Sequence, residues 1–160
     1  MEHGNFYTFN GYIKKDDSLL TASMEDYVEM IYRLSAEKGY TRIHDLAISL
    51  NVQPPSVTKM VQKLSELKLA YYEKYGLVSL TPEGKNIGKA LLTRHNTVER
   101  LLKLMGVSKS ILEETEKIEH SINEETLGCI YEFLNFIEVN PEIKDKFENY
   151  KSIQKKERDS

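Results

Sequence analysis

Cysteine is nearly absent from this chain, because Cys129 is the one cysteine among 160 residues. No intramolecular disulfide can therefore form, and a metal site built on several thiolates is excluded. Cys129 lies in the apolar stretch Leu127 to Ile130, with no histidine or basic residue near it in the sequence to activate it. We expect it to be a small buried hydrophobic residue.

Long apolar runs are also missing. No stretch approaches the roughly 18 apolar residues that span a bilayer, and Met1 to Tyr12 lacks the basic segment followed by an apolar one that marks a signal peptide. We therefore expect a cytoplasmic protein with no membrane partner. Hydrophobic residues make up 40% and charged residues 29% of the chain, which is ordinary for a foldable protein.

An excess of positive charge is missing as well. The net charge of −3 argues against a protein that coats nucleic acid by bulk attraction. The charges are nevertheless unevenly distributed: six of the fifteen residues 111–125 are Glu against one Lys, whereas residues 53–64 contain two lysines and no acidic residue. The chain is therefore divided into a basic and an acidic part.

Apolar residues recur at helical spacing in the first half of the chain, and two short β-like runs follow. The pattern predicts a first helix that is capped by Ser23 and closed by Gly39, and then two short helices, 43–50 and 56–67, which form a helix-turn-helix. The β-like runs, 69–72 and 77–80, turn at Tyr75-Gly76, as in the wing that follows many such motifs.

The second half predicts more helices. Thr81 as N-cap and Pro82 in the first position start a long helix that reaches about Met105, and Gly106 breaks it. Two helices follow over about 109–120 and 124–138, and the charge-mixed tail from Lys144 is expected to fray at its end. The expected fold class is mainly α: an N-terminal winged helix-turn-helix with a small β-hairpin wing, followed by a C-terminal helical domain.

The second helix of the helix-turn-helix presents polar side chains opposite its apolar stripe. Lys can neutralise phosphate charge, Ser and Thr can bond phosphate oxygens, and Gln can bond adenine or the backbone. A solvated helix face has the same composition, but the order helix, turn, helix, hairpin, helix favours a helix in the major groove with a wing beside it. The DNA-binding candidates are Gln53, Ser56, Thr58, Lys59, Gln62, Lys63 and, in the wing, Lys74.

Carboxylates at helical spacing occur on two predicted helices, as a pair on the first and as a Glu-x-x-Glu-His motif on a later one. A histidine also interrupts the apolar stripe of the long helix. Each feature alone has an ordinary explanation, which is a solvated acidic face or a hydrogen-bonded core histidine. The candidate metal ligands are Asp26, Glu29, His95, Glu116, Glu119 and His120.

Together these candidates comprise four carboxylates and two neutral imidazoles, a charge of −4 that two divalent cations would cancel. Like charges clustered in this way destabilise a fold unless something positive lies among them. Oxygen and imidazole donors suit Mn²⁺, Fe²⁺ or Ca²⁺-like ions better than soft metals, although Zn²⁺ also binds such a set. The residues alone favour a metal pair and leave its identity open.

Several separated motifs in the right order resemble the manganese-responsive (MntR) branch of the diphtheria toxin repressor superfamily. They are residues 23–29 (SMEDYVE), residues 55–64 (PSVTKMVQKL), Arg94-His95 and Ile118-Glu119-His120. The resemblance covers about Ser23 to Ile137 and implies a homodimer whose C-terminal domain is a helical dimerisation domain. It also implies repression of metal-uptake genes through binding to double-stranded, palindromic operator DNA.

The resemblance further implies a binuclear site for two Mn²⁺ ions per subunit at the domain junction. One ion would be held by Asp26, Glu116, Glu119 and His120, and the second by Glu29, His95, Glu116 and Glu119, with the two shared glutamates bridging. Iron-responsive relatives have Met at the position of Asp26 and Cys at that of Glu116, so the oxygen donors here indicate manganese. Fe²⁺, Zn²⁺ or Cd²⁺ could take its place.

These expectations divide the chain into an N-terminal arm (1–22), a DNA-binding domain (23–90), a metal-binding and dimerisation domain (91–142) and a charged tail (143–160). Besides an Fe²⁺- or Zn²⁺-responsive regulator of the same fold, two alternatives remain open. One is a winged-helix regulator with an organic ligand. The other is a di-metal hydrolase, which would leave the helix-turn-helix unexplained, so we do not expect an enzyme.

Overall fold

The computed structural model describes residues 20–158, so most of the proposed N-terminal arm, residues 1–22, lies outside the described part of the chain. The chain forms two compact units, of which the first ends at Asn96 and the second begins at Thr97. The long helix α5 (Pro82–Met105) begins in the first unit and ends in the second.

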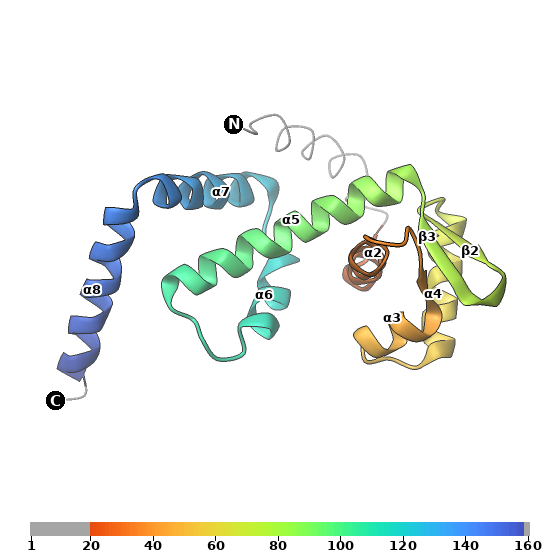
Figure 1. The fold of residues 1–160 in the computed structure, drawn as a ribbon, viewed down its shortest axis with the longest axis horizontal. Coiled ribbons are helices and arrows are strands. Elements are labelled where there is room, and N and C mark those ends of the chain that lie inside the picture. The colour runs from red at the N-terminus through yellow and green to blue at the C-terminus, as the bar shows by residue number, and fades with distance from the viewer. Residues whose placement is uncertain (1–19, 159–160) are drawn as a thin grey trace. The chain divides into compact units, whose positions relative to one another are not determined.

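The first unit is a winged helix-turn-helix, as the sequence predicts (Figure 1). Its antiparallel sheet has the strand order β1-β3-β2, and Val78 lies opposite Thr41 on one side and Tyr72 on the other. The hairpin of β2 and β3, closed by a 3-10 turn at Lys74–Gly76, is the wing. Before α5 the elements are α2 (Ala22–Leu34), β1 (Thr41–Arg42), α3 (Ile43–Ser49), α4 (Pro54–Glu66), β2 (Ala70–Glu73) and β3 (Leu77–Leu80).

The predicted N-cap is confirmed for α5 and wrong for α2. Thr81 accepts a hydrogen bond from the N–H of Gly84 at 3.0 Å, and its hydroxyl donates to the carbonyl of Lys68 at 2.9 Å. The cap of α2 is Thr21 rather than Ser23, because the Thr21 hydroxyl accepts the N–H of Met24 at 3.3 Å and the helix begins at Ala22. Both residue types suit a cap, so the sequence alone does not choose between them.

The core of this unit is built from the apolar stripes of its helices. On α4, Val57, Val61 and Leu64 are fully buried, at the i, i+4, i+7 spacing of one helix face. Val28 and Ile31 of α2 and Val78 of β3 are buried with them. The opposite side of α4 is thereby left to the solvent.

Glycine at position 88 lets α5 approach α2 closely within the first unit. A Cβ atom at Gly88 would lie 2.6 Å from Cβ and 3.0 Å from Cγ of Tyr32, which is too close for any ordinary contact. Glu29 lies three residues before Tyr32, so it shares the face of α2 that meets α5. The close approach therefore positions a predicted metal ligand.

The second unit consists of helices: the end of α5, then α6 (Ile111–Glu119), α7 (Glu124–Val139) and α8 (Pro141–Arg158). The residues expected to form a charged tail are mostly in α8, which runs to Arg158. Cys129 on α7 is exposed, so the expectation that it is buried is wrong; it lies on the outer side of a helix whose inward residues are Leu127, Leu134 and Ile137. Among residues 20–158, no helix has the length and apolar character of a membrane span.

One lysine joins α8 to the C-terminal end of α5. Lys151 Nζ donates to the carbonyl of Leu104 at 3.2 Å and to Glu148 at 2.9 Å, and it lies 4.8 Å from the ring centre of Phe147. A cation is favoured there because the last carbonyls of a helix have no partner within the helix.

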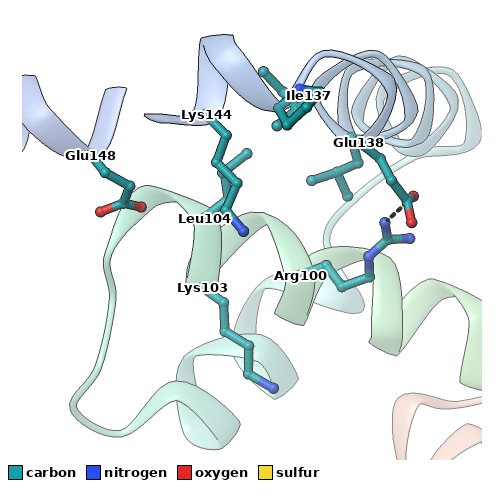
Figure 2. A pocket seen from close by; sticks show the side chains of 9 residues that line it. Arg100, Lys103, Leu104, Ile137, Glu138, Lys144 and Glu148 are labelled. Carbon is teal, nitrogen blue, oxygen red and sulfur yellow. Dashed lines mark hydrogen bonds and ion pairs between the residues drawn. The ribbon is translucent and has the colours of Figure 1, made fainter. Parts of the chain in front are cut away.

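A hollow of about 510 Å³ lies among α5, α7 and α8 of the second unit (Figure 2). Arg100 and Glu138 form an ion pair at 3.0 Å on its wall, and Lys103, Lys144 and Glu148 also line it. Its wall is therefore charged and of mixed sign.

Replacing Gly88 with Ala tests the close approach of α2 and α5. We expect Gly88→Ala to lower the free energy of unfolding by about 1–3 kcal/mol, because the added methyl group overpacks against Tyr32. Urea denaturation followed by circular dichroism measures the change, with exposed Asn86→Ala on the same helix as the control. A stabilisation of about 0.5–1 kcal/mol, the usual effect of Gly→Ala within a helix, would show that the helices are not in contact at this point.

Candidate functional site

The exposed face of α4 carries most of the predicted DNA-binding residues. Gln53, at the N-cap, and Ser56, Lys59, Gln62 and Lys63 are exposed. Thr58 differs, because it is half-buried and its hydroxyl donates to the carbonyl of Pro54 at 3.1 Å. No acidic residue interrupts this face before Glu66 at the end of the helix, so it can approach phosphates without repulsion.

The wing adds an exposed lysine and exposed tyrosines. Lys74 is exposed, as expected for a residue that flanks the bound helix. Tyr75 beside it is 91% exposed with a φ of 66°, and Tyr71 on β2 is also exposed. A tyrosine hydroxyl can bond a phosphate, so the wing exposes two more side chains of a phosphate-bonding type besides Lys74.

The metal candidates of the first unit lie on α2 and α5. His95 Nδ1 is 4.0 Å from Glu29 Oε1, and both residues are buried, at 6% and 9% exposed. With bonds of about 2.1 Å, two donors of one ion lie about 3–4.2 Å apart, depending on their angle. Glu29 and His95 are therefore spaced as a pair of ligands, while Asp26, three residues earlier on α2, is exposed.

Arg33, one turn after Glu29 on α2, contacts the same carboxylate. Its Nη2 donates a hydrogen bond to Glu29 Oε1, the oxygen that lies nearest His95. Arg33 is not among the residues singled out from the sequence, although a Glu four residues before an Arg on a helix is a known favourable pair. The contact matters here because the glutamate is buried.

A partly buried ion pair joins α5 to α2 beside these ligands. Arg94, 8% exposed, donates through Nη2 to Glu25 Oε2 at 2.5 Å. Glu25 lies one turn before Glu29, and Arg94 adjoins His95. The pair therefore determines which side of α5 faces α2, and with it the position of the imidazole.

The remaining candidates lie at the end of α6, in the second unit. Glu119 is 2% exposed, and its Oε1 is 3.7 Å from Nε2 of His120, which is half-buried at the C-cap of the helix. Glu116, three residues before Glu119, is exposed. The unit thus presents a second carboxylate and imidazole at the spacing of two ligands.

The other side of α6 is a solvated acidic face of the ordinary kind. Lys117 Nζ bonds Glu113 at 2.6 Å and Glu114 at 3.3 Å. The hydrogen bond from Lys117 lowers the pKa of Glu113. The hydrogen bonds to both glutamates raise the pKa of Lys117. The glutamates of α6 therefore fall into two groups. Glu113 and Glu114 pair with Lys117 at the surface, whereas Glu119 is the glutamate of this helix that is buried.

The donor sets of the two units fit a hard divalent cation. Each combines a carboxylate with an imidazole, at 4.0 Å in one unit and 3.7 Å in the other, and neither contains sulfur. Such donors suit Mn²⁺ and Fe²⁺ and also accept Zn²⁺. Burial of a carboxylate such as Glu119 requires compensating charge or hydrogen bonds, and a bound cation supplies charge of the right sign.

Two family models match consecutive parts of the chain. The model for the N-terminal DNA binding domain of the iron dependent repressors matches residues 19–78, and that for their metal binding and dimerisation domain matches residues 81–148. The chain is thus a DNA-binding regulator of the metal-dependent class. It belongs to the iron dependent repressor family.

Individual relatives carry regulatory names. The chain is 45% identical to the HTH-type transcriptional regulator MntR of Bacillus pumilus over 139 residues, which are 86% of this chain and 94% of the relative. The MntR regulator of Bacillus subtilis is 44% identical over 139 residues, 86% of this chain and 96% of the relative. Both comparisons span nearly the full length of the relative.

Two solved structures share the fold. The T. acidophilum IdeR structure has a TM-score of 0.63 and 33% identity over 69% of this chain. The manganese regulator SloR has a TM-score of 0.63 and 28% identity over 73% of this chain. The chain spans about half the length of these two proteins, 53% and 55%.

Proposed function

We propose that this chain is a Mn²⁺-dependent repressor that controls metal-uptake genes. The observation that carries the proposal is the pair of donor sets, Glu29 with His95 in the DNA-binding unit and Glu119 with His120 in the helical unit. A centre that draws on both sets would couple the ion to DNA binding. The relatives named MntR and the neighbour described as a manganese regulator support manganese as the ion.

The proposed centre is binuclear and lies at the junction of the two domains. Asp26, Glu116, Glu119 and His120 would hold one ion, and Glu29, His95, Glu116 and Glu119 the second. Glu116 and Glu119 would bridge. Asp26 and Glu116 supply oxygen donors where the iron-responsive relatives have Met and Cys, and this difference favours manganese over iron.

Repulsion among the carboxylates, and its relief by bound ions, would switch DNA binding off and on. Bound ions supply the positive charge that offsets repulsion among the four carboxylates. Without that charge, repulsion among the carboxylates, which Arg33 relieves only at Glu29, favours states in which the two ligand sets are apart. With it, the carboxylates hold α2 and α6 in one arrangement, and a preference of a few kcal/mol for that arrangement is enough to change DNA occupancy.

DNA recognition is assigned to α4 and the wing. Lys59 and Lys63 would contact phosphates, Gln62 would reach base edges in the major groove, and Lys74 would flank them. Two copies in a homodimer would present two α4 helices to a palindromic operator, at a separation of about one helical turn of DNA or a multiple of it.

Metal-dependent DNA binding is the direct test. We expect Mn²⁺ to tighten binding to a duplex from the promoter of a Mn²⁺ transporter by about a hundredfold or more, corresponding to a few kcal/mol of preference for the binding-competent state. Fluorescence anisotropy at fixed ionic strength, with chelator against Mn²⁺, measures it. Equal affinity with and without Mn²⁺ contradicts the proposal.

Lys63→Ala tests the DNA-binding face of α4. The variant should bind all DNA sequences more weakly, and the slope of log affinity against log salt concentration should fall by about 1. Lys109→Ala in the α5–α6 loop removes the same charge elsewhere and serves as the control.

Substitution of Asp26 tests the identity of the metal. Asp26→Met removes a hard oxygen donor and adds a softer thioether, so we expect the Mn²⁺ response to weaken relative to the Fe²⁺ response. The same anisotropy assay, run anaerobically across a series of Mn²⁺, Fe²⁺ and Zn²⁺ concentrations, gives the ratio. An unchanged ratio would show that this position does not select the metal, and a wild-type response to Fe²⁺ or Zn²⁺ alone would replace manganese by that ion.

A further inference from the structure

We propose that Arg33 is a resident cation of the metal centre, which neutralises Glu29 in the metal-free protein and must leave this carboxylate when a divalent ion binds. The inference rests on the proposed function, because that function assigns Glu29 to the metal. It adds a residue that sets metal affinity without being a ligand.

Two groups converge on one oxygen of Glu29. Arg33 Nη2 donates to Oε1, and His95 Nδ1 lies 4.0 Å from the same Oε1. A guanidinium has only donors and no lone pair to offer a metal, so it cannot join the ligands. A carboxylate can accept from a donor and bind an ion at once, but Arg33 holds Oε1, the oxygen next to His95, so an ion placed between Glu29 and His95 competes with Arg33 for that oxygen. The positive charge of Arg33 also repels an ion bound at Glu29 and His95.

The position of Arg33 allows it to leave. Its side chain is 33% exposed while that of Glu29 is 11% exposed, so the guanidinium can turn toward water without disturbing the core. Its Nε is buried without a hydrogen-bond partner, which means that the arginine neutralises the carboxylate while leaving one of its own donors unsatisfied. Hydration of that donor on leaving offsets part of the lost ion pair.

An ordinary surface ion pair would not have this effect. Lys103 and Glu99 on α5 form a pair with the same spacing of four, at 2.9 Å, but the lysine is 56% exposed and neither residue is a metal candidate. Exposed pairs of this kind contribute little because water solvates both charges. The dipole at the end of α2 favours a cation at position 33, but it does not explain the contact with a buried carboxylate that is spaced as a metal ligand.

The experiment compares direct Mn²⁺ binding to the full chain in the wild type, Arg33→Met, Arg33→Lys and Lys103→Met. Isothermal titration calorimetry gives the affinity and number of ions, and thermal unfolding in chelator gives the stability of the metal-free protein. We expect Arg33→Met to raise the affinity for the ion at Glu29 by about tenfold. This effect lies between the effects of losing an exposed ion pair and losing a buried one. The substitution should also lower the metal-free melting temperature by about 3 °C. Arg33→Gln gives the same comparison if the methionine variant does not fold.

The controls separate competition from general electrostatics. Arg33→Lys keeps the charge and should bind Mn²⁺ within about twofold of the wild type, and Lys103→Met, which removes the same charge elsewhere, should do the same. Unchanged or weaker Mn²⁺ binding in Arg33→Met overturns the role of Arg33 and leaves the proposed function standing. A wild type that binds no Mn²⁺ overturns both.

Discussion

The charge of two buried carboxylates has to be compensated, and the rest of this structure depends on that constraint. Glu29 and Glu119 are buried in a chain whose other acidic residues mostly remain at the surface. A carboxylate in such a place is stable only when positive charge or hydrogen-bond donors are brought to it. Arg33 meets this need at Glu29, and Arg94 meets it at the neighbouring Glu25. The proposed ions would be further cations placed by the same requirement.

The packing of α2 on α5 in the first unit determines where Glu29 and His95 lie relative to each other. Gly88 permits the close approach, Thr81 fixes the residue at which α5 begins, and the Arg94–Glu25 pair selects the side of α5 that faces α2. An α-helix turns once in 3.6 residues, so these three restraints leave little freedom in where His95 lies. Ligands on packed helices are held more precisely than ligands on loops. The residues proposed to contact DNA lie on α4, whose apolar side is buried in the same core. The proposed DNA-binding surface and the ligands of the first unit therefore depend on one small domain.

Much of this could be predicted from the sequence, because the decisive signals are local. Apolar spacing predicted α2, α4 and α5, the Thr81-Pro82 pair predicted the start of α5, and alternation with a glycine turn predicted the wing. Strand β1 could not be predicted, because two residues carry no alternation and the strand exists through its pairing with β3. Helix α8 was missed because its residues are mostly polar and none is buried. One contact of α8, the hydrogen bond from Lys151 to the carbonyl of Leu104, joins residues that are far apart in the sequence.

The ligand candidates illustrate the same limit. Spacing placed Asp26 with Glu29 and Glu119 with His120, but only the structure brings His95 to Glu29 and adds Arg33 to the same oxygen. The central claim is that metal binding needs ligands from both units, and electron paramagnetic resonance of Mn²⁺ tests it most directly. The wild type should bind two ions per chain with the signal of a coupled pair, and both Glu29→Gln in the first unit and Glu119→Gln in the second should lose that signal. A Glu119→Gln variant that retains the coupled pair would contradict the account.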